Sequence, residues 1–176
     1  MEMVCEMSEH SASEARLSSR LGMASWWLVH SARTAVAATV SIYIARILKL
    51  PEPYWAAVST IIVTQSTLGA ALRISFSRFI GTVLGCSAAV LLGTYFGPQP
   101  LIFGVGVLCL GLVCFAMRLD RSAYRFAGIS LCIVMMVVRT IAVWRVGIHR
   151  FGEVSVGIFV GLVIAALWPH DDPPEK

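Results

Sequence analysis

Apolar residues gather into six long runs between Ser31 and Trp168, and charged residues or prolines separate one run from the next. Each run holds about 18–21 residues, close to the roughly 20 that a helix needs to cross the hydrocarbon core of a membrane. Because lipid offers the backbone no hydrogen-bond partners, this pattern predicts an all-α, polytopic transmembrane helical bundle. The predicted spans are Ser31–Leu48, Tyr54–Leu72, Phe79–Phe96, Gln99–Met117, Ala123–Val143 and Ile148–Trp168.

The fifth span has the least support, because the uncharged stretch between Arg125 and Arg139 is short. It crosses the membrane fully only if these arginines extend toward the headgroups or face other helices. A chain of five spans with one re-entrant segment is the alternative.

Polar segments flank the apolar body. We expect residues 1–30 to form a polar N-terminal tail, 31–169 a six-helix transmembrane domain and 170–176 a polar C-terminal tail. Of the 176 residues, 57% are apolar and 14% charged, where a soluble domain usually has about 45–50% and about 25%. The composition therefore excludes an ordinary soluble domain.

The charges of the apolar body are strongly unbalanced. From Ser31 to Trp168 there are eleven Lys and Arg residues but three acids, Glu52, Asp120 and Glu153. This excess of positive charge favours an anionic ligand over a cationic one. The distribution of arginines between the predicted loops favours an N-terminus and a C-terminus that are both cytoplasmic, although several arginines fall on the predicted outer side.

An internal repeat would account for those outer arginines. Arg78-Phe79 opens the third span and recurs at the start of the sixth as Arg150-Phe151, and Gly85 matches Gly157 at the same offset. Two units of three helices would point in opposite directions through the membrane, with a substrate site near the midplane. The pattern indicates a 3+3 inverted repeat, with chance recurrence in an apolar chain as the alternative.

Pairs of glycines spaced four residues apart mark expected helix contacts. Gly81 and Gly85 form one such pair, and Gly157 and Gly161 form another. The absence of side chains lets a neighbouring backbone approach closely. We therefore predict that these four residues form packing seams.

Polar side chains inside the spans are the candidates for ligand contact. Tyr54 and Trp55 are expected to anchor the second span at the headgroup layer. A buried amide or guanidinium needs polar partners, and arginine matches the two-pronged geometry of a carboxylate. The candidate substrate-binding residues are Arg33, Gln65, Arg78, Arg139 and Arg150.

Glu153 is the one acid predicted to lie inside a span. It follows Arg150 by three residues and His149 by four, so the three side chains share a helical face. One interpretation is a local ion pair that allows Arg150 to enter the membrane. The other is a protonatable group coupled to transport, with His149 as its partner.

The sequence contains little that suggests catalysis. The five cysteines have no spacing typical of a zinc site or a redox pair, and we expect neither a metal nor another cofactor. Ser130 lies too deep in its span to be activated by His149, so we expect no enzyme. The arginines alternate between the two membrane faces, which argues against nucleic-acid binding.

Two motifs in a fixed order resemble the fusaric acid resistance and aromatic acid exporter family. The first is the Pro53-Tyr54-Trp55 start of the second span, and the second is the Arg-x-x-Gly-Thr-x-x-Gly run from Arg78 to Gly85. The resemblance covers roughly Ser31 to Pro169. Other matching positions are Arg33, Thr64, Gln65, Gly69, Arg73, Arg150, Gly157 and Trp168.

The resemblance implies a six-helix module of a bacterial inner membrane that exports aromatic carboxylates, small organic anions, with energy from the proton gradient. Plant anion channels that work as dimers look like distant relatives, so a homodimer and a dimeric anion channel are both expectations. Larger members look like a six-helix block followed by a cytoplasmic domain. Here the chain ends soon after Pro169, so we expect a separate soluble or periplasmic adaptor subunit as a further partner beside the lipid bilayer. A non-transporting membrane subunit that packs against a partner chain is the alternative function.

Overall fold

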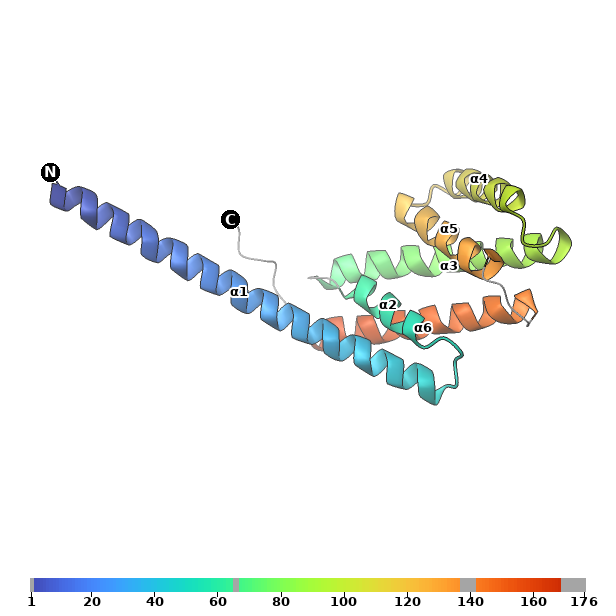
Figure 1. Ribbon diagram of the computed structural model, residues 1–176, viewed down its shortest axis with the longest axis horizontal. Helices are drawn as coiled ribbons and strands as arrows, with labels where there is room; N and C mark the ends of the chain where they lie inside the picture. The colour runs from blue at the N-terminus through green and yellow to red at the C-terminus, as the bar shows by residue number, and fades with distance from the viewer. Residues whose placement is uncertain (1, 65–66, 137–141, 169–176) are drawn as a thin grey trace.

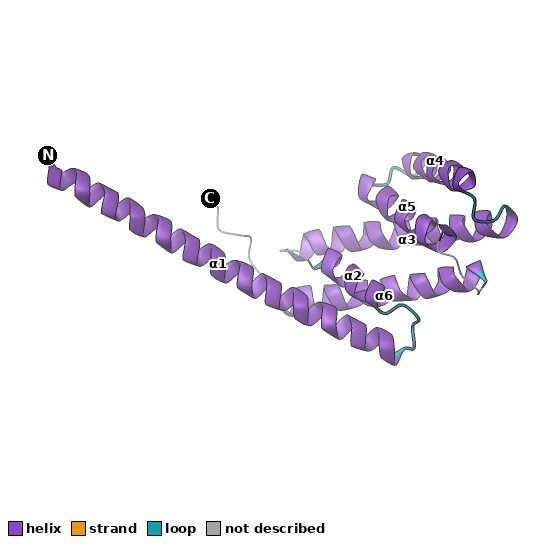
Figure 2. Ribbon diagram, in the orientation of Figure 1, coloured by secondary structure: helices purple, strands orange, loops and turns teal. Residues whose placement is uncertain are grey.

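The computed structural model describes the backbone of residues 2–64, 67–136 and 142–168, with side chains from residue 22 onward. These residues form helices joined by short connections (Figure 1), and no strand occurs among them (Figure 2). Successive helices run in alternate directions through the bundle (Figure 1). The helices are α1 Glu2–Ile47, α2 Tyr54–Val63, α3 Leu68–Tyr95, α4 Pro100–Ala116, α5 Arg121–Met136 and α6 Val143–Leu167. The predicted all-α fold is confirmed.

Within the part of the chain that the structure describes, three helices are long and apolar enough to cross a membrane. They are the Gly22–Ile47 part of α1, then α3 and α6, while α2 and α4 are shorter apolar helices. The backbone of α1 is continuous from Glu2, so the expected polar tail leads directly into the first span.

The expected second span, Tyr54–Leu72, is divided into two helices. Helix α2 ends at Val63, and Thr67 begins α3 by accepting a hydrogen bond from the backbone N–H of Ala70. Thr67 supplies a cap of the kind that a hydropathy pattern averages away. Only the first turn of α3 belongs to the expected second span, and Gln65 lies outside the described residues.

Helices α1 and α4 end in the same way. Lys49 follows α1 with φ 54°, and Arg118 follows α4 with φ 53°. In each case the next residue's N–H returns to a carbonyl five residues earlier, at 3.0 Å from Leu50 to Ala45 and at 2.9 Å from Leu119 to Cys114. This left-handed cap satisfies the last carbonyls of the helix and reverses the chain.

The four predicted packing glycines lie at close helix crossings within the chain. A Cβ atom on Gly81 or Gly85 would meet the carbonyl oxygen of Ala123 or Ala127 on α5. A Cβ atom on Gly157 would meet the carbonyl oxygen of Ala56 on α2, and Gly161 faces Val63 of the same helix. The glycines therefore allow α3 to contact α5, and α6 to contact α2, backbone against backbone.

The arrangement of helices has the symmetry of a 3+3 repeat. If α1 is exchanged with α4, α2 with α5 and α3 with α6, every packed helix pair of the described structure again corresponds to a packed pair. The pair α3 with α5 becomes α6 with α2, and α3 with α6 maps onto itself. At the last of these interfaces the rings of Phe79 and Phe151 lie 5.3 Å apart, so equivalent side chains meet where the halves join.

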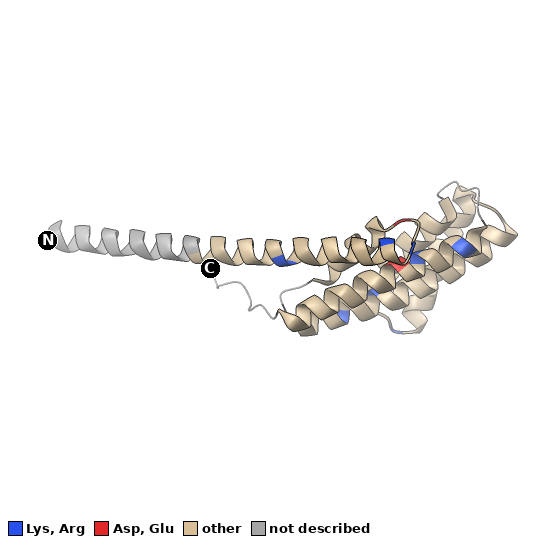
Figure 3. Cartoon of the chain, turned by 90° about the horizontal axis from the view of Figure 1, so that it is seen from below, with Lys and Arg blue, Asp and Glu red and all other residues tan. Residues whose placement is uncertain are grey.

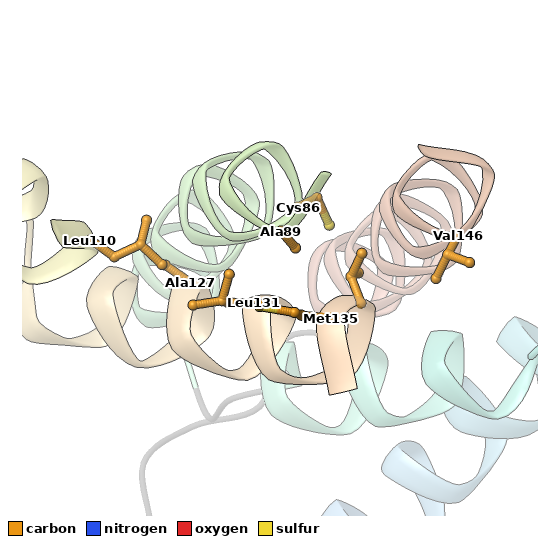
Figure 4. Packing of buried hydrophobic residues seen from close by; sticks show 8 residues of the cluster. Cys86, Ala89, Leu110, Ala127, Leu131, Met135 and Val146 are labelled. Carbon is orange, nitrogen blue, oxygen red and sulfur yellow. The ribbon is translucent and has the colours of Figure 1, made fainter. Parts of the chain in front are cut away.

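A hydrophobic core joins α3, α4, α5 and α6. Figure 4 shows Cys86 and Ala89 of α3 facing Leu131 and Met135 of α5, with Val146 of α6 beside them. Small residues fill the α3 side of this cluster, which suits the close approach that the glycines permit.

Candidate functional site

Trp55 and Arg150 form the centre of the candidate site. Pro53 ends the connection after α1, so that Trp55 falls in the first turn of α2 and faces α6. The Cζ atom of Arg150 lies 3.6 Å from the centroid of the Trp55 ring, in cation–π contact. The contact holds the plane of the guanidinium against the indole and contributes about 2 kcal/mol when desolvated.

The buried guanidinium of Arg150 has N–H donors that no described residue accepts. The residue is only 3% exposed, and among the described residues its Nε and Nη1 atoms have no hydrogen-bond partner. A buried donor without an acceptor costs about 1–3 kcal/mol, and more when it is charged. Nε and Nη1 do not share an edge of the guanidinium, so they suit two separate acceptors, and an anion on either one would also meet the buried positive charge.

Glu153 and His149 lie beside Arg150, as the helical spacing predicts. Glu153 is 1% exposed, and its Oε1 atom accepts a hydrogen bond of 2.9 Å from the backbone N–H of Glu52. The side chain of Glu52 in turn accepts a bond of 3.0 Å from Nε1 of Trp55. Both acids attract Arg150 electrostatically.

A cavity of about 10 Å³ lies among these groups, which is room for about one water molecule. Among the described residues the Nδ1 atom of His149 is buried without a hydrogen-bond partner. The site therefore combines one cation, two acids and an imidazole around a space that a proton-carrying water could occupy. The lining residues are Pro51, Glu52, Val146, His149, Arg150 and Glu153.

Arg78 of α3 is a second buried guanidinium close to the first. It donates from Nε and Nη2 to the Oγ atom of Ser59, at 3.2 and 3.0 Å, and its Cζ atom lies 4.8 Å from the centroid of the Phe126 ring. The positive charge of Arg150 acts on Arg78, so the two cations repel each other. An anion between them would relieve that repulsion.

The other candidate residues are not part of this cluster. Arg33 is buried at the far end of α6, where its Nη1 atom donates to the carbonyl oxygen of Trp168 at 2.8 Å, an interaction typical of a helix C-terminus. Tyr54 is 53% exposed, which suits the expected interfacial anchor, whereas the ring of Trp55 contacts Arg150. Gln65 and Arg139 lie outside the described residues.

Three contacting residues have no conspicuous signal in the sequence. Ser59, Phe126 and Glu52 look like an ordinary hydroxyl, an apolar ring and a loop acid. The repeat could have identified Phe126, because it follows Trp55 at nearly the same interval at which Arg150 follows Arg78.

The fold and the site together define a multi-pass helical membrane protein with cations buried inside its bundle. Figure 3 shows basic positions within the helices as well as at their ends. Buried arginines in a membrane protein are costly and mark pathways for ions or substrates. Buried cations of this kind are typical of membrane transport proteins.

Residues 27–173 match the Fusaric acid resistance protein family, and the chain belongs to that family. The resemblance seen in the two sequence motifs is thereby confirmed. The family and the names of the relatives support a role in membrane transport and point to a transporter rather than an enzyme.

Curated relatives are much longer than this chain. "Uncharacterized transporter YdhK" of Escherichia coli K12 is 30% identical over 159 residues, which is 85% of this chain and 23% of that protein. The protein of the same name from Salmonella typhimurium is 27% identical over 149 residues, 80% of this chain and 22% of its own length. "UPF0421 protein YgaE" of Bacillus subtilis is 22% identical over 90 residues, 51% of this chain and 26% of that protein. The chain thus spans about a quarter of the length of the relatives that it matches.

Proposed function

We propose that the chain is a transport module for small organic anions, and that it exports aromatic carboxylic acids with energy from the proton gradient. One observation carries this proposal. Arg150 is buried against Trp55 with two donors that no described residue accepts, which fits a carboxylate as the missing acceptor. The neighbouring indole of Trp55 suits an aromatic substrate.

Glu153 and His149 are the proposed proton-coupling groups. They share a water-sized cavity with Arg150, so the charge of Glu153 and the charge of a bound carboxylate act on the same guanidinium. Protonation of Glu153 would release Arg150 from that attraction and strengthen its interaction with the substrate.

We further propose a bacterial inner-membrane location with both termini cytoplasmic, as the arginine distribution favours.

The homodimer remains a proposal, and the two protomers would have to contact each other through a surface other than the glycine pairs. Gly81, Gly85, Gly157 and Gly161 are occupied by packing within the chain. A soluble or periplasmic adaptor subunit is also proposed.

Flux measurements in liposomes test the function directly. Purified protein in vesicles should accelerate the movement of labelled benzoate across the bilayer, and an imposed pH gradient should accelerate it further. Empty vesicles and vesicles with a protein of similar size supply the background. Folded protein at the correct density in the bilayer that moves no benzoate would reject autonomous transport and favour a non-transporting subunit.

Changing Glu153 to Gln tests the coupling. Glutamine keeps an oxygen that can accept from the N–H of Glu52 but removes the titration, so the variant should fold and bind benzoate. Its flux should no longer respond to the pH gradient. Gradient-driven flux that persists in folded Glu153→Gln protein argues against the coupling role. Loss of thermal stability that Arg150→Gln then restores would favour the ion-pair interpretation.

A further inference from the structure

The inverted repeat relates Arg78 to Arg150 together with the surroundings of each. Arg78 lies on the ring of Phe126, and Arg150 lies on the ring of Trp55. The interval from Trp55 to Phe126 along the chain nearly equals the interval from Arg78 to Arg150. The same aromatic platform therefore supports a buried guanidinium in both halves.

The glycine crossings extend this correspondence to two serines. A Cβ atom on Gly157 would meet the Cβ of Ser59, and one on Gly85 would meet the Cβ of Ser130. Ser59 and Ser130 are separated by the same interval as the two rings, and both are buried. Each half thus has an arginine, an aromatic ring and a serine in equivalent positions.

Hydrogen bonding distinguishes the two arginines. Ser59 donates its own hydrogen to the carbonyl of Trp55 at 2.8 Å, so its oxygen is left to accept from Arg78. It receives both Nε–H and Nη2–H, the edge with which arginine holds a carboxylate. Arg150 keeps its Nε and Nη1 atoms without a partner among the described residues. One site is closed by a protein oxygen, and its counterpart is open.

We propose that Arg78, Phe126 and Ser59 form a second carboxylate-binding site, which the Ser59 hydroxyl closes in the conformation described here. The inference rests on the proposed function, in which Arg150 and Trp55 bind the carboxylate of the substrate. A substrate oxygen replaces the Ser59 oxygen on the guanidinium when this second site opens.

Benzoate binding to the full chain in detergent, followed by isothermal titration calorimetry, tests the second site. Arg150→Gln should weaken benzoate binding at least about tenfold, because it removes the positive charge and both unpartnered donors. Adding Ser59→Ala to Arg150→Gln should recover most of that loss, because Arg78 then has an unoccupied edge. A third change, Arg78→Gln, should abolish the recovery.

Ser130→Ala is the matched control, since it removes the equivalent hydroxyl from the other half. In the Arg150→Gln background it should restore no binding. If Arg150→Gln does not fold, Arg150→Lys replaces it as the background, because lysine keeps the charge without the planar pair of donors.

The outcomes separate this inference from the proposed function. Folded wild-type protein that binds no benzoate would reject both. Wild-type binding without recovery in the Arg150→Gln/Ser59→Ala protein would reject the second site alone, and so would equal recovery with Ser130→Ala. Recovery with Ser59→Ala that depends on Arg78 supports it.

Discussion

Arg150→Gln should lower the rate of benzoate flux into liposomes about a hundredfold, since losing a buried, charge-assisted contact costs about 3 kcal/mol. The guanidinium is buried, stacked on Trp55 and unsatisfied at two nitrogens among the described residues, and the proposed function assigns the substrate carboxylate to it. Glutamine removes the positive charge and the guanidinium donors while leaving a polar side chain of moderate size. The measurement is the initial rate of labelled benzoate uptake at equal protein density.

Arg145→Gln is the matched control for this experiment. Arg145 lies earlier on the same helix and is exposed, with its guanidinium over the ring of Trp144. The control should keep most of the wild-type flux. Equal losses in both variants would mean that net charge, and not the site at Arg150, governs the flux.

Gly157→Ala is expected to lower the midpoint of thermal unfolding by roughly 5–10 °C, because overpacking a close contact costs about 1–3 kcal/mol. The added methyl group would overlap the carbonyl oxygen of Ala56 and the Cβ of Ser59, neither of which is a flexible chain end. Helices α2 and α6 must separate to admit it, and the contact between Trp55 and Arg150 separates with them. Thermal unfolding in mild detergent reports the change.

Gly104→Ala provides the comparison, because a Cβ atom there meets nothing within 4 Å. Alanine also favours the helix over glycine by about 1 kcal/mol, so this variant should be as stable as the wild type or more stable. A Gly157→Ala protein that unfolds at the wild-type temperature would contradict the tight crossing of α2 and α6.

Much of the architecture follows from the sequence because lipid restricts what an apolar chain can form. The runs of apolar residues predict helices, and the glycine pairs predict where these helices meet. The recurrence of Arg78-Phe79 as Arg150-Phe151 indicates the repeat from a few identities. Its support comes from the packing, in which equivalent helices make equivalent contacts.

Other features depend on packing that no local pattern contains. The rule that tryptophan favours the headgroup layer assigns Trp55 to the membrane surface. The face of α2 that contacts α6 adds a contact that this rule does not predict, the one between Trp55 and Arg150, and it depends on the fit of Gly157 against Ala56. The break after Val63 escapes a hydropathy average because the hydroxyl of Thr67 begins a new helix within an otherwise apolar stretch.

The two halves of the repeat are not chemically equivalent at one position. Applying the offset between Arg78 and Arg150 to Glu153 leads to Gly81, which is packed against the carbonyl of Ala123 and has no room for a side chain. A molecule inserted in the opposite orientation would present the same backbone framework to the membrane. Its buried acid would lie in the half that takes the place of the other. The two opposite orientations of insertion are therefore not equivalent, because the direction of insertion determines which leaflet the half with the buried acid faces.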